Sequence, residues 1–123
     1  MSATEGLRLG QHGRYIVTVT IDHRARRNAM SRAMLADLAA LWDRLDQDEE
    51  CRCVVVTGAG DKAFTSGADV SGDLSASEAV ARSVNRGLLK TSTFSKPVIA
   101  AVNGDCVAGG LELLLATDIR AAA

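Results

Sequence analysis

The 123 residues carry a net charge of −1 and are 47% apolar, 24% charged and 3% aromatic, a balance typical of one folded domain rather than a disordered chain. The near-neutral charge argues against a basic surface for nucleic acid or an anionic membrane, and the few aromatic residues offer little for stacking bases. No apolar run reaches the roughly eighteen residues of a membrane span, and residues 1–14 lack the apolar core of a secretory signal. We therefore expect a cytoplasmic protein.

The cysteines are Cys51, Cys53 and Cys106. An odd number without the spacing of a disulfide framework fits a reducing compartment. No further cysteine or histidine cluster accompanies them, so we expect ordinary thiols and no metal site.

The first part of the sequence predicts a strand, a helix and a second strand. Residues 15–21 alternate β-branched residues, as a strand does. Ser31 is a suitable N-cap for a helix that starts near Arg32. Its apolar residues recur at helical spacing: Met34, Leu35, Leu38, Leu41, Trp42 and Leu45. We expect this helix to fray in the acidic stretch 46–50, because carboxylates there oppose the helix dipole. Residues 51–57 predict a buried strand.

A glycine-rich, irregular segment follows over residues 58–73, with the sequence GAGDKAFTSGADVSGD. Ser77 is then expected to cap a second helix. One stripe of that helix would contain Val80, Val84, Leu88 and Thr91. Lys96-Pro97 ends it, since proline cannot continue a helix.

Residues 98–102 predict another buried strand, and Asn103-Gly104 predicts a turn. Residues 108–116 form a glycine-started apolar helix, and residues 119–122 begin a further strand. Strands that alternate with helices indicate an α/β fold with a mainly parallel sheet.

Two segments combine a strand, a glycine turn and the approach to a helix: residues 64–70 and residues 103–110. Glycines let backbone N–H groups approach a ligand closely, and a helix N-terminus attracts negative charge. Two convergent N–H donors form an oxyanion hole, in which each donor contributes about 3–4 kcal/mol to the transition state. Neither segment contains the phosphate-binding motifs GxGxxG or GxxxxGK[ST]. Ordinary structural turns are the alternative explanation, and it stays open.

Glu112 lies in an apolar stretch, Gly109 to Leu115. One interpretation is a buried carboxylate, which must be paired or belong to a site and would suit general acid/base work. The other is an exposed glutamate that stabilises the first turn of its helix. The residues alone do not choose between them.

These segments together resemble the crotonase (enoyl-CoA hydratase/isomerase) family. Residues 54–70, VVVTGAGDKAFTSGADV, resemble its strand followed by TG and F-x-x-G-A-D. Residues 96–123 resemble KP, an apolar strand, NG, GG-x-E-L and D-I-R. Residues 22–29 resemble the loop that ends in Asn-Ala before the first helix. The resemblance implies the N-terminal portion of the family's ββα spiral core, over residues 13–123, after a lead-in over residues 1–12.

By position, the resemblance implies that the N–H groups of Ala68 and Gly109 hold the thioester oxygen of an acyl-CoA. Glu112 falls on the first catalytic glutamate of the hydratases. Further residues fall where the family holds CoA: Arg26, Arg27, Asn28, Ala29, Ser66, Gly67, Asp69, Val70 and Gly110.

The loop departs from the family pattern, because His23-Arg24-Ala25 stands where Arg-Pro is usual. We expect His23 to be a surface turn residue. Arg24, Arg26 and Arg27 either meet CoA phosphates or form a solvated basic turn. Ser66 replaces a small apolar residue before the motif glycine.

The hydratases carry a second catalytic glutamate beyond the position where this sequence stops. We therefore expect an incomplete domain, either a fragment or a truncated gene product. The resemblance implies an enoyl-CoA hydratase-like lyase without a cofactor apart from the CoA of its substrate, assembled as a homotrimer or homohexamer. The alternatives are another crotonase reaction (isomerase, hydrolase, decarboxylase or dehalogenase), a non-catalytic acyl-CoA-binding subunit, and an α/β domain whose glycine loops are only turns.

Overall fold

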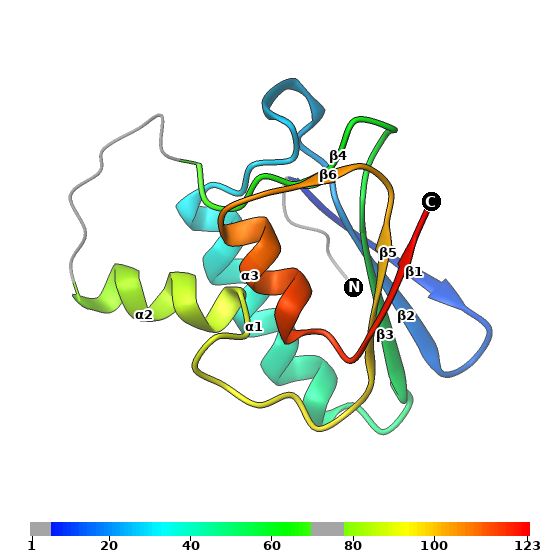
Figure 1. Cartoon of the computed structure of the whole chain (residues 1–123). Helices are drawn as coiled ribbons and strands as arrows, with labels where there is room; N and C mark the ends of the chain where they lie inside the picture. Colours follow the sequence, from blue (N-terminus) through cyan, green and yellow to red (C-terminus); the bar gives the residue numbers. More distant parts are fainter. Residues whose placement is uncertain (1–5, 70–77) are drawn as a thin grey trace.

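The computed structural model describes residues 6–69 and 78–123, which form a sheet with three helices on one of its faces (Figure 1). The elements in chain order are β1 (Leu7–His12), β2 (Ile16–Ile21), the 3-10 turn η1 (Arg24–Arg26), α1 (Arg32–Gln47), β3 (Cys53–Gly58), β4 (Ala63–Thr65), α2 (Glu78–Gly87), β5 (Val98–Val102), β6 (Asp105–Cys106), α3 (Gly109–Ala116) and β7 (Ile119–Ala122). No helix in these described ranges is both long and apolar enough to cross a membrane.

The main sheet has the strand order β1-β2-β3-β5-β7. β1 is antiparallel to β2, and every other neighbouring pair is parallel. A second sheet consists only of β4 and β6, which pair in parallel. The parallel pairs confirm the predicted α/β fold.

The connections between the parallel strands repeat one pattern. β3 is followed by β4 of the small sheet and then by α2, and β5 is followed by β6 and then by α3. β2 and α1 form a related unit, because Met30 between them makes a parallel bridge to Ala68. Each unit thus supplies one main-sheet strand, one extended segment at the sheet's carboxyl edge, and one helix. This arrangement is the ββα spiral expected from the sequence.

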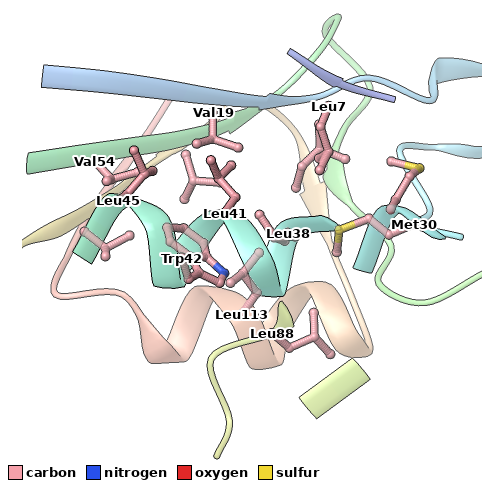
Figure 2. Packing of buried hydrophobic residues seen from close by; sticks show 14 of the residues in the cluster. Leu7, Val19, Met30, Leu38, Leu41, Trp42, Leu45, Val54, Leu88 and Leu113 are labelled. Atoms are coloured by element: carbon pink, nitrogen blue, oxygen red, sulfur yellow. The ribbon is translucent and has the colours of Figure 1, made fainter. Parts of the chain in front are cut away.

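Helix α1 lies between the sheet and the other two helices (Figure 2). Figure 2 shows Leu41 and Leu45 of α1 close to Val19 and Val54 of the sheet. All four side chains are buried. Trp42 continues this layer toward α2, where its Nε1 donates a hydrogen bond of 2.9 Å to the carbonyl oxygen of Gly87.

Both ends of α1 are capped by side chains. The hydroxyl of Ser31 accepts a 3.1 Å hydrogen bond from the N–H of Met34, which confirms the predicted N-cap. At the other end, the Lys96 ammonium donates to the carbonyl oxygens of Leu45 and Asp48. A cation at this position suits the negative end of the helix dipole. The helix ends at Gln47, inside the acidic stretch 46–50.

The strands expected to be buried are covered on one face only. In β3 and β2 the residues alternate between buried and half-buried, because the helices lie on a single side of the sheet. The apolar runs over residues 51–57 and 98–102 therefore predicted the strands correctly but not their one-sided burial.

The end of the second helix differs from the prediction. The stripe Val80 to Thr91 and the expected stop at Lys96-Pro97 implied a helix that runs past Thr91, whereas α2 ends at Gly87. The chain leaves the helix because Leu89 adopts a left-handed conformation with φ of 57°. The predicted cap Ser77 lies outside the described residues.

Candidate active site

The two glycine segments meet at the carboxyl edge of the main sheet. β4 and β6 pair through Ala63 with Asp105 and Thr65 with Cys106. Beyond this pairing the chains approach so closely that a Cβ built on Gly67 would lie 2.6 Å from both N and Cα of Gly109. A Cβ built on Gly110 would lie 2.0 Å from the carbonyl oxygen of Thr65. Only glycine permits this contact.

The N–H groups of Ala68 and Gly109 lie at this contact. A Cβ on Gly109 would be 3.3 Å from the amide nitrogen of Ala68. Neither N–H donates a hydrogen bond to any part of the chain within residues 6–69 and 78–123. The neighbours are satisfied, since Asp69 N–H donates to the carbonyl oxygen of Met30 at 2.7 Å and Gly110 N–H donates to that of Val107 at 2.9 Å. Two adjacent, unused donors can serve as an oxyanion hole.

The second donor is presented by a strained turn. Ala108 has φ of 50° and ψ of −125°, the values of the first central residue in a type II′ turn, where glycine is the usual residue. The hydrogen bond from Gly110 N–H to the Val107 carbonyl closes this turn. Gly109 follows as the first residue of α3, so its N–H has no partner inside the helix. Backbone strain of this kind is concentrated at functional sites.

Residues 23–30 are fixed by the side chain of Asn28. This residue is 1% exposed and left-handed, with φ of 58°. Its Nδ2 donates to the carbonyl oxygens of Ala59 and Ala63 at 3.0 and 2.8 Å, and its Oδ1 accepts from the N–H of His23 at 2.8 Å. His23 is half-buried, and its Nδ1 lies 2.8 Å from the carbonyl oxygen of Ala29. His23 is thus a turn residue that holds the loop together.

The side chain of Asn103 connects the loop after β5 to the same loop after β3. Its Nδ2 donates to the carbonyl oxygens of Gly60 and Ala63, and its Oδ1 accepts from the N–H of Gly58. The carbonyl oxygen of Ala63 therefore accepts from both Asn28 and Asn103. The loops after β2, β3 and β5 are tied together by these two asparagines, a role that the sequence analysis missed for both.

The two segments predicted to hold CoA lie side by side. Ser66 N–H donates to the carbonyl oxygen of Arg27 at 3.2 Å, and Met30 N–H donates to that of Gly67 at 2.7 Å. An open groove of about 530 Å³ runs along them and is lined by Ala25, Arg26, Arg27, Ala29, Ser66, Ala68 and Asp69.

Among the described residues predicted to hold CoA, three do not line this groove: Asn28, Gly67 and Gly110. Asn28 turns its side chain into the protein and borders a separate pocket of about 250 Å³. Gly67 and Gly110 lie at the close backbone contact between the two glycine segments. Val70 lies outside the described residues.

The arginines of the loop differ in their pairing. Arg24 pairs with Asp22 at 3.1 Å, and Arg27 lies 3.9 Å from a carboxylate oxygen of Asp105. Arg26 is exposed and forms no ion pair within the described part of the chain. It is therefore the loop arginine most available to an anionic ligand.

Glu112 lies in the first turn of α3, one turn after Gly109. Its side chain is 44% exposed and forms an ion pair with Lys90, so in this chain the buried interpretation is wrong. Burial was expected because Glu112 has apolar neighbours. Those neighbours on the same face, Leu111 and Leu115, are themselves exposed.

The three cysteines are free thiols. Burial raises the pKa of the Cys51, Cys53 and Cys106 thiols, and for Cys51 the nearby Lys96 opposes this shift. Within residues 6–69 and 78–123, no three His, Cys, Asp or Glu side chains gather as a metal site would require.

A sequence profile described as Enoyl-CoA hydratase/isomerase matches residues 11–123. The chain belongs to this family, the crotonases. It is 39% identical over 115 residues to enoyl-CoA hydratase EchA19 of Mycobacterium tuberculosis, a match covering 88% of this chain and 43% of that protein. It is 37% identical over 131 residues to the mitochondrial Delta(3,5)-Delta(2,4)-dienoyl-CoA isomerase of Mus musculus, covering 94% of the chain and 40% of the isomerase.

The crotonase fold is also found by comparison of structures. The crystal structure of an enoyl-CoA hydratase from Bacillus anthracis matches with a TM-score of 0.83 and 30% identity, over 95% of this chain and 47% of that one. The chain thus spans less than half the length of each of these three proteins.

Proposed function

We propose that this protein hydrates a 2-enoyl-CoA thioester. The observation that carries the proposal is the pair of adjacent, unused N–H donors on Ala68 and Gly109, with Glu112 one helical turn beyond the second. Family membership supports the same reading, and so does similarity to a protein named as an enoyl-CoA hydratase.

The chemistry follows from the position of these groups. The thioester oxygen accepts hydrogen bonds from both N–H groups, which draws electrons away from the conjugated double bond. The oxygen of a water molecule bonds to C3 of the acyl chain, and the resulting enolate is stabilised by the two donors, each contributing about 3–4 kcal/mol. Glu112 orients this water and takes part in its proton transfer, while the enolate gains a proton at C2. In the hydratases that the chain resembles, a second carboxylate shares this work.

CoA would lie along the groove between the two loops. Ala29, Ser66 and Asp69 border it, and the guanidinium of Arg26, which forms no ion pair with the described residues, would meet a phosphate. Hydration moves only protons and water, so we propose that no cofactor is needed apart from the CoA of the substrate. We also propose a cytoplasmic homotrimer or homohexamer. The exposed side chains of Val107, Leu111, Leu115 and Ile119 and the free thiols are compatible with this.

Double-bond isomerisation is the second candidate, because the chain is also similar to a protein named as a dienoyl-CoA isomerase. It would use the same two donors, since an enolate also forms when a proton leaves C2. A non-catalytic acyl-CoA-binding protein would use them for binding alone.

The test is turnover of crotonyl-CoA by the protein and its Glu112→Gln variant, with 3-enoyl-CoA and 3,5-dienoyl-CoA as second substrates. We expect hydration with kcat lowered about 100-fold or more in the variant, the range of general acid/base catalysis. Isomerisation without hydration would select the second candidate. Binding of the thioester without any turnover would select the non-catalytic one.

A further inference from the structure

Lys90 is held at a fixed point beside the active site by the end of α2. Three hydrogen bonds close this helix end. The N–H groups of Leu88, Leu89 and Lys90 donate to the carbonyl oxygens of Val84, Arg86 and Asn85, respectively. Leu89 is left-handed, with φ of 57°. This is the geometry in which a helix end closes on itself and redirects the chain. The backbone of Lys90 is therefore fixed, although its side chain is 42% exposed.

The same turn is packed against the rest of the site. Leu88 is 3% exposed, and its Cδ1 would lie 3.4 Å from a Cβ built on Gly109. The hydrogen bond from Trp42 Nε1 to the Gly87 carbonyl and the close approach of Gly87 to the Leu35 carbonyl oxygen hold the turn on α1. Lys90 thus shares a rigid support with the second oxyanion donor.

Lys90 Nζ forms an ion pair with Glu112 Oε2. The pair joins the C-terminal end of α2 to the first turn of α3. Each charge also suits its own helix end, since a cation is favoured at a C-terminus and an anion at an N-terminus. An exposed ion pair of this kind adds little to folding stability. Its main effect is therefore to fix the position of the Glu112 carboxylate.

We infer that Lys90 is a positioning residue for Glu112, an inference that rests on the proposed function. An exposed glutamate on a helix populates several rotamers, and the ammonium selects one of them. Within the described residues, Lys90 does not line the predicted CoA groove and forms no hydrogen bond with the oxyanion donors. It would therefore act on the reaction through Glu112. Removing it should affect the chemical step more than substrate binding.

The experiment is steady-state hydration of crotonyl-CoA by the wild type and by the variants Lys90→Met, Lys90→Arg and Glu112→Gln, with Lys90→Met also placed in the Glu112→Gln background. We expect Lys90→Met to lower kcat about 10-fold or more with KM within twofold, since small displacements of a catalytic group cost one to two orders of magnitude. Lys90→Arg should recover most of the loss. In the Glu112→Gln background Lys90→Met should cost nothing further.

Arg14→Met is the matched control. It breaks another exposed ion pair, Arg14 with Glu50, at the end of the sheet opposite the site, and should leave kcat unchanged. A Lys90→Met variant with kcat within twofold of wild type overturns the inference, and so does an equal loss in the Glu112→Gln background. A wild-type protein that does not hydrate crotonyl-CoA overturns the proposed function, and the inference with it.

Discussion

Gly67 and Gly109 face each other so closely that a side chain on the first would overlap the backbone of the second, with a Cβ placed 2.6 Å from the amide nitrogen of Gly109. The two residues are 42 positions apart in the sequence and come together because β4 pairs with β6. The two unused N–H groups, of Ala68 and Gly109, lie at this contact.

This contact predicts that Gly67→Ala abolishes function. The backbone of Gly109 would have to move, which separates the donors, and we expect a loss of about 100-fold or more in kcat/KM, the size seen when one oxyanion donor is lost. Gly13→Ala is the control. Gly13 also has a positive φ, 65°, but nothing lies within 4 Å of its added Cβ. It should cost about 1–2 kcal/mol of stability and no activity. Equal activity loss in both variants would contradict this reading of the contact.

Ala108→Gly is expected to stabilise the protein. Alanine at φ of 50° and ψ of −125° is strained, and glycine relieves the strain while adding some entropy to the unfolded chain. We expect a net gain of roughly 0.5–1 kcal/mol in the free energy of unfolding, measured by urea denaturation. Ala108→Val should destabilise. A glycine variant less stable than wild type would show that the turn is not strained.

Asn28→Ala should be among the most damaging substitutions in the loop. It leaves the Ala59 carbonyl oxygen and the His23 N–H without their Asn28 partner, while the Ala63 carbonyl oxygen keeps its bond from Asn103. Each unmet buried group costs about 1–3 kcal/mol. We expect a loss of about 3 kcal/mol or more in the free energy of unfolding. Asn103→Ala removes the same number of hydrogen bonds from a half-exposed side chain. Water can replace part of that set, so its loss should be smaller.

The raised pKa values of the cysteine thiols predict that the rate of their chemical labelling depends on pH. Burial raises the pKa of all three cysteines, so the reactive thiolate is scarce at neutral pH and increases only as the pH rises above the ordinary thiol value of about 8.5. Iodoacetamide should label the folded protein slowly at pH 7, with Cys51, 1% exposed, the slowest. The unfolded protein should be labelled fast at all three positions. Rapid labelling of folded Cys51 at pH 7 would contradict the buried placement.

Much of the fold was predictable because its signals are local. The Ser31 cap, the helical spacing from Met34 to Leu45 and the apolar strand at residues 98–102 each depend on neighbouring residues alone. β1, β4 and β6 were not predicted. β1 is largely exposed, and only Leu7 and Leu9 of its six residues have apolar side chains. β4 and β6 are three and two residues long. Such strands exist through their pairing, which a local pattern cannot reveal.

The candidate site was also only partly predictable from the sequence. Gly67, Ala68, Gly109 and Glu112 were predicted as site residues from the family resemblance. The ion pair of Lys90 with Glu112 was not predicted, because it depends on the left-handed turn at Leu89. The hydrogen bonds from the Asn28 side chain to Ala59 and Ala63 were not predicted, since these partners lie more than thirty residues away in the sequence.

The central claim is that the Ala68 and Gly109 N–H groups bind the thioester oxygen. Amide NMR of the protein titrated with butyryl-CoA, and with a thioether analogue that lacks the carbonyl group, tests it most directly. Both amide protons should shift downfield with the thioester and stay in place with the thioether, although both ligands carry CoA. Unchanged Ala68 and Gly109 resonances in the thioester complex, or equal shifts with the two ligands, would contradict the claim.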